Sequence, residues 1–135
     1  MLLVRTVLKV SPIDGIGCFA GEHIAQGQPV WRFVPEFDRA LRQNFAVADS
    51  EFLHRYAQLC PYSGLWMLCV DNARFMNHSD NPNVAVKAPL SDPSLTHDAV
   101  REILTGEELT CDYRVGDAVP FDGFVPVKNK ELILR

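Results

Sequence analysis

Residues 74–83 read Arg-Phe-Met-Asn-His-Ser-Asp-Asn-Pro-Asn and join an apolar run to a proline turn. The region Leu65 to Arg74 begins with an apolar run of six residues, which predicts a buried strand. Taken singly, the polar residues are ordinary turn and capping residues. A lone histidine such as His78 is more often structural than a base or a metal ligand. Several amides in one short stretch can satisfy the edges of an adenine and a ribose, so this stretch is a candidate ligand site.

Toward the N-terminus the pattern predicts short strands followed by a helical insert. Residues 2–10 are rich in β-branched side chains, residues 18–20 form a short second run, and a third run ends at Pro35. Between Asp38 and Cys60 apolar residues recur at threes and fours, which is helical spacing. The last helix of this insert is expected to begin at Ser50 and to end before Pro61.

Toward the C-terminus the pattern is again β-rich. Val84 and Val86 alternate with smaller residues, and residues 100–113 predict a strand, a turn at Gly106 and a second strand. Residues 89–98 are polar and broken by a proline, which predicts a surface loop. We therefore predict a mainly β fold with one small helical insert. Alternating long helices are lacking in this pattern, which argues against a parallel α/β fold.

One pattern occurs twice. Positions 24, 27 and 30 hold an apolar residue, a glycine and another apolar residue, and positions 103, 106 and 109 repeat this order. This repeat predicts two similar β-turn units at opposite ends of the domain. Two copies are too few for a solenoid, which needs at least about three repeats.

Length and composition set limits on the function. A chain of 135 residues with 47% hydrophobic and 22% charged residues fits one folded domain. The net charge of −4 argues against nonspecific nucleic-acid binding, which needs a basic face. A solvated acidic surface explains the charge, and acidic walls that attract a basic ligand are the alternative. No stretch approaches the roughly 20 apolar residues of a membrane helix. The first residues also lack a secretory pattern, so we expect a cytosolic protein with no membrane partner.

The four cysteines do not suggest a metal site. They occupy positions 18, 60, 69 and 111, without a Cys-x-x-Cys pair and without histidines at zinc-finger spacing. We expect scattered, buried thiols and no bound metal.

Residues 15–20, Gly-Ile-Gly-Cys-Phe-Ala, formally fit the dinucleotide-binding fingerprint G-x-G-x-x-A. That fingerprint requires a helix that begins at the glycines. Gly21, Gly27 and Pro29 follow closely and argue against such a helix. Two interpretations remain: a tight turn that needs positive φ, or bare backbone against which a ligand lies flat.

A third segment, residues 106–113, reads Gly-Glu-Glu-Leu-Thr-Cys-Asp-Tyr and predicts a glycine turn and a strand that ends at Tyr113. A lone tyrosine is usually a core residue with its hydroxyl bonded to a carbonyl. No Ser/His/Asp order and no metal-ligand set is evident in the sequence. The residues alone therefore indicate a β-rich domain with a plausible ligand site.

Taken together, the three segments resemble the SET domain, the family of protein-lysine methyltransferases. Residues 15–17 resemble its first motif, residues 74–83 its R-F-x-N-H-S-x-x-P-N motif, and residues 106–113 its G-E-E-L-T-x-D-Y motif. The resemblance implies one SET domain over residues 1–135, with a core from about 4 to 113 and a tail from 114 to 135. It also implies several small sheets and a pseudoknot, in which the segment at Asn77-His78 passes beneath the one that carries Tyr113.

The resemblance further implies S-adenosylmethionine as the cofactor and transfer of its methyl group to a lysine amine of a protein or basic peptide. Tyr113 would line the point where cofactor and substrate channel meet, and would orient the amine. No general base is required, because desolvation and the positive sulfur both favour the neutral amine. The residues expected at the cofactor are the backbone of Ile16, Gly17 and Cys18, with Arg74, Asn77, His78 and, with less support, Tyr56.

The tail departs from the pattern of many family members, which carry a zinc-binding cysteine cluster after the final tyrosine. This chain has no cysteine after Cys111. Phe121 or Phe124 would supply the aromatic wall of the channel instead, or both would simply anchor the tail. A homodimer would be another way to complete the channel.

Two other functions are compatible with the residues: a non-catalytic SET module that binds cofactor or peptide, and an enzyme for a small amine. The sequence names neither the target lysine nor the number of methyl groups added. A nuclear location would also fit if the source is eukaryotic.

Overall fold

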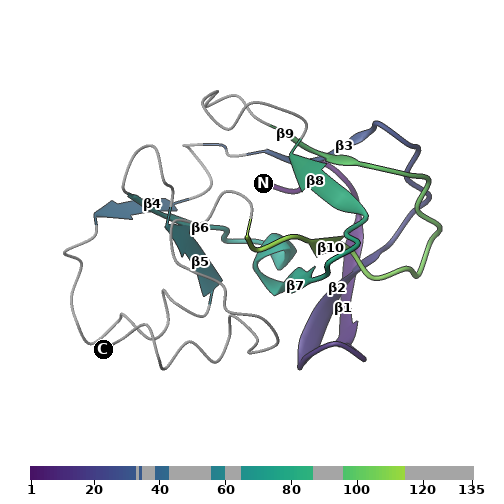
Figure 1. The fold of residues 1–135 in the computed structure, drawn as a ribbon, viewed down its shortest axis with the longest axis horizontal. Coiled ribbons are helices and arrows are strands. Elements are labelled where there is room, and N and C mark those ends of the chain that lie inside the picture. Colours follow the sequence, from purple (N-terminus) through teal and green to yellow (C-terminus); the bar gives the residue numbers. More distant parts are fainter. Residues whose placement is uncertain (33, 35–38, 43–55, 60–64, 87–95, 115–135) are drawn as a thin grey trace.

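The computed structural model describes residues 1–32, 34, 39–42, 56–59, 65–86 and 96–114. Within these ranges the chain forms short strands in four small sheets and one 3₁₀ helix, η2 (Figure 1). The elements, in chain order, are β1 (Thr6–Val10), β2 (Ile16–Ala20), β3 (Pro29–Arg32), β4 (Arg39–Arg42), β5 (Ala57–Leu59), β6 (Leu65–Leu68), η2 (Asn72–Phe75), β7 (Asn77–His78), β8 (Val84–Val86), β9 (Thr96–Ala99) and β10 (Thr110–Cys111).

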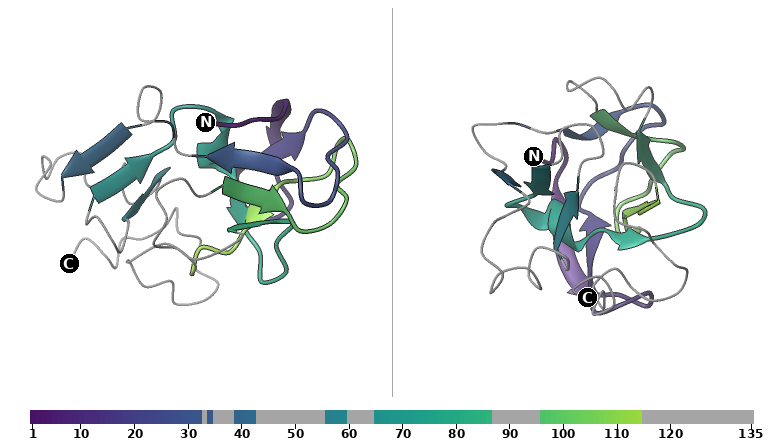
Figure 2. Two further views of the ribbon diagram at one scale, coloured as in Figure 1. Left: turned by 90° about the horizontal axis from the view of Figure 1, so that it is seen from above. Right: turned by 60° about the vertical axis from the view of Figure 1, so that its left-hand side comes forward.

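The four sheets are a hairpin, two three-stranded sheets and a parallel pair. Strands β1 and β2 form an antiparallel hairpin, and β3–β9–β8 and β4–β6–β5 are antiparallel sheets. Strands β7 and β10 pair in parallel. Figures 1 and 2 show the β4–β6–β5 sheet at one side of the molecule, away from the hairpin and the β3–β9–β8 sheet. The mainly β fold of several short sheets is confirmed.

The repeated sequence pattern forms the centre of the core. Ile24 and Ile103 exchange two backbone hydrogen bonds of 2.9 Å, and both side chains are fully buried. Gly27 and Gly106 have φ angles of 80° and 92°, which glycine adopts without strain. The two β-turn units are confirmed, but they lie side by side rather than at opposite ends, because their backbones bond to each other.

The backbone contacts between the two units are reciprocal. The Gly27 N–H donates to the Ala99 carbonyl, and the Gly106 N–H, at the matched position, donates to the Ala20 carbonyl. The strand contacts repeat in the same way, since residue 29 lies opposite residue 98 and residue 108 lies opposite residue 19. Backbone N–H and carbonyl groups of each unit thereby find their hydrogen-bond partners in or beside the other unit. The largest fully buried side chains are Ile24, Ile103, Leu109, Val30, Val84, Asn77 and Cys18.

The predicted helical insert is confirmed at Tyr56, which is helical, and is wrong at the other described residues between Asp38 and Cys60. Residues 39–42 and 57–59 are strands β4 and β5, and both pair with β6. Apolar spacing at threes and fours favours a helix, but a neighbouring strand offers the same backbone groups a ladder of hydrogen bonds. Residues 43–55, including the expected cap Ser50, lie outside the described residues.

The surface loop predicted over residues 89–98 is wrong at its end. Thr96–Ala99 is β9, the central strand of the β3–β9–β8 sheet, and Asp98 and Ala99 are buried. Polar residues such as His97 favour an exposed loop in the sequence, whereas in the structure they lie on the central strand of a sheet. Residues 87–95 lie outside the described residues. No helix among the described residues is long and apolar enough to cross a membrane.

The imidazole of His97 is a largely buried titratable group of this sheet. Its ring meets the Trp31 indole edge-on, with ring centroids 5.1 Å apart and planes at 79°. Burial lowers the pKa of His97 to about 4, although the Asp98 carboxylate acts in the opposite direction and the N-terminal ammonium adds to the lowering. Among the described residues, no hydrogen-bond partner faces its Nδ1 or the Trp31 Nε1. The fold therefore accommodates the neutral imidazole.

Acid should destabilise the protein through His97. The unfolded chain binds a proton near pH 6.5 and the folded chain only near pH 4, so stability present above pH 6.5 is lost as the pH falls between these values. The loss at pH 5 should be about 2 kcal/mol. Urea unfolding from pH 7.5 to 4.5 measures it. His97→Phe should flatten the profile, while His23→Gln, at an exposed site, should keep it; equal profiles for wild type and His97→Phe would contradict this assignment.

Candidate functional site

The parallel pairing of β7 and β10 brings two distant motifs together. Thr110 lies opposite Asn77 and Cys111 lies opposite His78. The Ser79 N–H extends the pairing with a 3.1 Å bond to the Cys111 carbonyl. Residues 74–83 and 106–113 therefore form one structural unit, in the side-by-side arrangement that the expected pseudoknot requires.

Tyr113 packs directly against this unit. Its backbone N–H donates to Nδ1 of His78 over 3.1 Å, and the centroids of the two rings lie 5.4 Å apart. Its hydroxyl donates a short hydrogen bond to the carbonyl of Met76, the residue before Asn77. Burial raises the pKa of the Tyr113 phenol well above its ordinary value near 10, so the hydroxyl stays protonated at neutral pH. Tyr113 is therefore a hydrogen-bond donor of fixed direction rather than a phenolate base.

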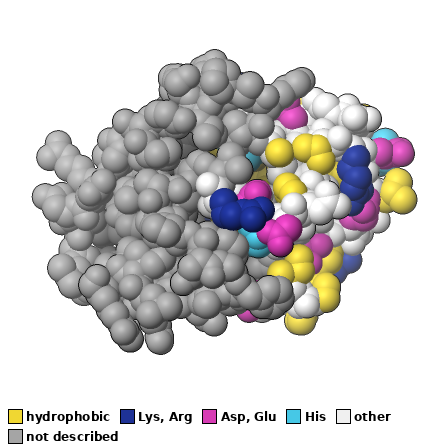
Figure 3. Space-filling view, viewed as in Figure 1, with side chains coloured by type: hydrophobic (Ala, Val, Ile, Leu, Met, Phe, Trp, Pro, Cys, Tyr) yellow, Lys and Arg dark blue, Asp and Glu magenta, His cyan; other side chains and the backbone are white. Residues whose placement is uncertain are grey.

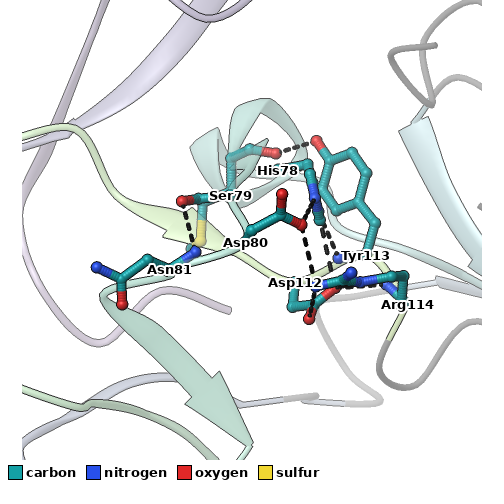
Figure 4. A network of polar contacts seen from close by, with 8 residues as sticks. His78, Ser79, Asp80, Asn81, Asp112, Tyr113 and Arg114 are labelled. Carbon is teal, nitrogen blue, oxygen red and sulfur yellow. Dashed lines mark hydrogen bonds and ion pairs between the residues drawn. The ribbon is translucent and has the colours of Figure 1, made fainter. Parts of the chain in front are cut away.

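A polar network fixes the His78 ring (Figure 4). Because Nδ1 accepts from Tyr113, Nε2 carries the hydrogen, and it lies 3.1 Å from the Asp80 carboxylate. Arg114 binds Asp112 through two bonds of 2.8 Å and reaches Asp80 at 3.0 Å. These bonds lower the pKa of Asp112. Arg114 and Asp80 are largely exposed, so each ion pair contributes little alone, but together they join the turn after β7 to the residue before Tyr113.

The side chain of Asn77 is buried and points to the glycine turn. Its Nδ2 donates to Ser11 Oγ at 3.0 Å, to the Asp14 carbonyl at 3.0 Å and to Glu108 Oε1 at 2.8 Å. The two amide hydrogens are thus used within the protein. Contact with a ligand is left to the Oδ1 atom and the backbone of Asn77.

The two glycines of the first motif serve different purposes. Gly15 has a φ of 48° and makes the hairpin turn, which confirms the tight-turn interpretation. Gly17 lies in β2, where an added Cβ would approach Glu108 Oε1 to 2.2 Å and Ser11 Cβ to 2.9 Å. The carboxylate of Glu108 therefore occupies the space that a side chain at position 17 would need. No helix begins at these glycines, since Ile16–Ala20 is a strand, and the dinucleotide fingerprint is excluded.

Arg74 lies on η2 beside two aromatic rings, whose centroids are 5.9 Å apart. The Asp71 side chain caps this helix by accepting from the Ala73 N–H. The guanidinium carbon of Arg74 lies 5.5 Å from the Phe75 ring centroid and 5.8 Å from that of Tyr56. The Arg74 Nε is buried and has no hydrogen-bond partner among the described residues. A cation with an unused, buried donor is suited to a carboxylate.

The cysteines of the site are packing residues. The Cys18 carbonyl accepts from the Leu109 N–H at 2.7 Å, and burial raises the pKa of the Cys18 and Cys111 thiols to about 12. Both thiols therefore stay neutral. In the part of the chain that the structure describes, no group of three or more His, Cys, Asp or Glu side chains could hold a metal ion.

The site residues expected from the sequence thus fall into two clusters. Asn77 bonds to Glu108, whose carboxylate lies over Gly17, and His78, the next residue of β7, bonds to Tyr113. Arg74 and Tyr56 form a second cluster beside η2, which packs on β1 and β2. Ile16, at the start of β2, is partly exposed, and the Cys18 thiol faces the core. Phe121 and Phe124 lie outside the described residues.

Three polar residues of the site had no assigned role in the sequence interpretation. Ser11 follows the strand predicted over residues 2–10, and Asn83 and Glu108 lie within the second and third motifs with no partner assigned. Asn83 accepts from the Thr110 N–H at 2.9 Å and donates to the Glu108 carbonyl at 2.8 Å. The missed signal at Ser11 is its place before a proline turn, where its hydroxyl accepts from the Ile13 N–H.

Comparison with known proteins decides the family. The family model of the SET domain matches residues 15–114, well over half of the chain. The chain belongs to the SET domain family. A curated relative, the putative histone-lysine N-methyltransferase 1 of Plasmodium falciparum, is 28% identical over 123 residues. The alignment covers 84% of this SET domain and 2% of that relative, so the match concerns a small part of a much longer protein.

Solved structures show the same fold. A humanized mutant of the Chaetomium thermophilum Polycomb Repressive Complex 2, bound to the inhibitor GSK126, aligns with a TM-score of 0.60 and 21% identity. An active Polycomb Repressive Complex 2 in the basal state aligns with a TM-score of 0.63 and 24% identity. The alignments cover 86% and 85% of this SET domain and 16% of each matched chain.

Replacing Gly17 should test the contact with Glu108. Gly17→Ala places a methyl group against the carboxylate and should lower the free energy of unfolding by about 1–3 kcal/mol. Gly15→Asn is the matched control, because that position is open and asparagine tolerates positive φ. Denaturant unfolding measures both. Equal stability of Gly17→Ala and wild type would show that Glu108 does not occupy this space.

Proposed function

We propose that this SET domain transfers a methyl group from S-adenosylmethionine to a lysine side-chain amine of a protein substrate. The observation that carries the proposal is the position of Tyr113. Its phenol lies beside Asn77-His78 and donates to the Met76 carbonyl, although 35 residues separate it from His78 in sequence. Membership of a family of lysine methyltransferases supports the same reaction.

The residues around Arg74 fit the cofactor. S-adenosylmethionine carries a carboxylate, and the buried Arg74 Nε, without a partner among the described residues, is a suitable donor for it. When bound, the cofactor supplies a methyl group already activated by the sulfonium charge. The groups proposed to hold it are the backbone of Ile16, Gly17 and Cys18, with Tyr56, Arg74, Asn77 and His78.

The role proposed for Tyr113 is orientation. Its hydroxyl hydrogen is directed at the Met76 carbonyl, and its raised pKa keeps that hydrogen in place at neutral pH. A phenol oxygen that donates its hydrogen keeps the capacity to accept one from an amine. The amine must lose its proton before reaction, and burial beside a positive sulfur favours that loss without a base. A fixed acceptor then holds the nitrogen in line with the methyl group.

The proposed substrate is a basic segment of a protein. The net charge of −4 favours the approach of cationic partners, mainly through their rate of encounter. Figure 3 shows acidic side chains spread over the visible described face and mixed with basic ones, so no single acidic wall dominates that face. The relative named as a histone-lysine methyltransferase supports a basic substrate. A homodimer and a cytoplasmic location stay predictions.

A transfer assay tests the function. Labelled S-adenosylmethionine and a panel of basic proteins, at pH 7 to 9, should yield labelled lysine with the wild-type domain. Tyr113→Phe should lower turnover roughly ten- to a hundredfold, because the amine loses its fixed acceptor, and should leave cofactor affinity within about twofold. Cofactor binding without transfer to any protein would instead identify a non-catalytic module. Unchanged turnover of Tyr113→Phe would refute the orienting role.

Arg74→Gln should weaken cofactor binding. The variant removes the partly buried cation beside Tyr56 and Phe75, and a lost bond to a charged group lowers affinity about tenfold or more. Titration calorimetry with S-adenosylhomocysteine measures this change. Arg101→Gln is the control, since Arg101 is exposed and bonded to Glu107. A similar affinity for both variants would place the cofactor carboxylate elsewhere.

A further inference from the structure

We propose that Glu108 is a positioning residue, whose carboxylate clamps Ser11 and Asn77 and thereby fixes residues 11–17 in the shape that binds the cofactor. This inference rests on the proposed function, since it assigns a cause to the affinity for S-adenosylmethionine. Glu108 belongs to the third sequence motif, whereas the segment it holds contains the first.

The clamp begins at Ser11. The Ser11 hydroxyl donates to both carboxylate oxygens of Glu108, at 2.7 and 2.9 Å. The same oxygen accepts from the Ile13 N–H at 2.9 Å and lies 3.4 Å from the Asp14 nitrogen. Glu108 therefore sets the direction of the hydroxyl, and the hydroxyl in turn sets the turn backbone.

Asn77 closes the clamp from the other side. Its Nδ2 contacts Glu108 Oε1, Ser11 Oγ and the Asp14 carbonyl at 2.8 to 3.0 Å. The amide thus bonds both to the Glu108 carboxylate and to the backbone of the turn that this carboxylate orients through Ser11. The first, second and third motifs are joined at this one point.

The position requires a carboxylate. Ser11 and Asn77 both present hydrogens to Oε1, and Oε2 lies 2.9 Å from the same Ser11 hydroxyl. Charge strengthens such bonds about twofold over neutral ones. A glutamine at position 108 could keep an acceptor at Oε1, but its amino group would then face the Ser11 oxygen, which already accepts from the Ile13 N–H and from Asn77. Gly17 completes the arrangement, because any side chain there would displace the carboxylate.

The backbone of Glu108 is held independently of its side chain. Residue 108 lies opposite Phe19, its carbonyl accepts from the Asn83 side chain, and the next N–H donates to the Cys18 carbonyl at 2.7 Å. A change of the side chain alone should therefore leave this strand contact in place. The neighbouring Glu107 bonds instead to Arg101 and to the Leu104 N–H, which lie within its own turn.

The test compares Glu108→Gln with its neighbour Glu107→Gln. Three quantities are measured on the intact chain: the dissociation constant for S-adenosylmethionine by calorimetry, the hydrogen exchange of the Ile13 amide without cofactor, and the midpoint of thermal unfolding. Glu108→Gln should weaken cofactor binding about tenfold and accelerate Ile13 exchange by a similar factor. Glu107→Gln should bind as wild type does.

The outcomes separate the clamp from the proposed function. If wild type binds the cofactor and Glu108→Gln binds it equally well, the clamp is refuted and the function stands. If wild type binds no S-adenosylmethionine, the proposed function fails, and the role of Glu108 toward the cofactor fails with it. A fall in the unfolding midpoint with unchanged affinity would assign Glu108 to stability alone and also overturn the proposal.

A second variant covers the case in which Glu108→Gln does not fold. Ser11→Ala removes the other half of the same clamp and should weaken cofactor binding by a comparable factor. Where both fold, the double variant should bind scarcely more weakly than either single variant, because the two residues act as one unit. Full additivity of the two losses would contradict a shared clamp.

Discussion

The site depends on the contact between two very short parallel strands, β7 and β10. A parallel pair of two residues each offers few backbone bonds, and parallel ladders are slightly weaker per residue than antiparallel ones. Side chains supply the remaining contacts. The amide of Asn83 bonds both to the Thr110 N–H and to the Glu108 carbonyl, and His78 accepts from the Tyr113 N–H. The second and third motifs are polar because these side chains take the place of a longer sheet.

The core explains why this contact can form at all. The two glycine-turn units bond to each other through Ile24 and Ile103, which brings the start of the chain beside residues 103–109. Residue 108 then lies opposite Phe19, within reach of the first motif. The apolar residues of the repeat pack into the core, and its glycines adopt the positive φ angles that the two turns need. The polar site is built at the edge of this apolar centre.

The sequence predicted the strands β1, β2, β3, β6, β8 and β10 and the family of the site, because alternation, turn residues and long motifs are local signals. It failed at β4 and β5, where pairing with β6 overrode the helical spacing, and at β9, whose His97 is typical of a loop. It also failed at residues 72–74, where the predicted strand gives way to η2 because the Asp71 side chain caps a helical turn. The outcomes at the strands depend on partners distant in the chain. The same reason hid the role of Ser11, since its partner Glu108 lies 97 residues away.

In the glycine motif, too, the reason for a residue becomes clear only from residues that are distant in the chain. In sequence, the two glycines suggested either a turn or a bare surface for a ligand, and the structure gives a separate reason for each. Gly15 supplies the positive φ of the turn, whereas Gly17 leaves room for the carboxylate of Glu108. The first and third motifs are therefore complementary in size: a side chain at position 17 and a carboxylate at position 108 exclude each other. A side chain at position 17 would therefore require a change at position 108, so the two motifs act as one structural element of the site.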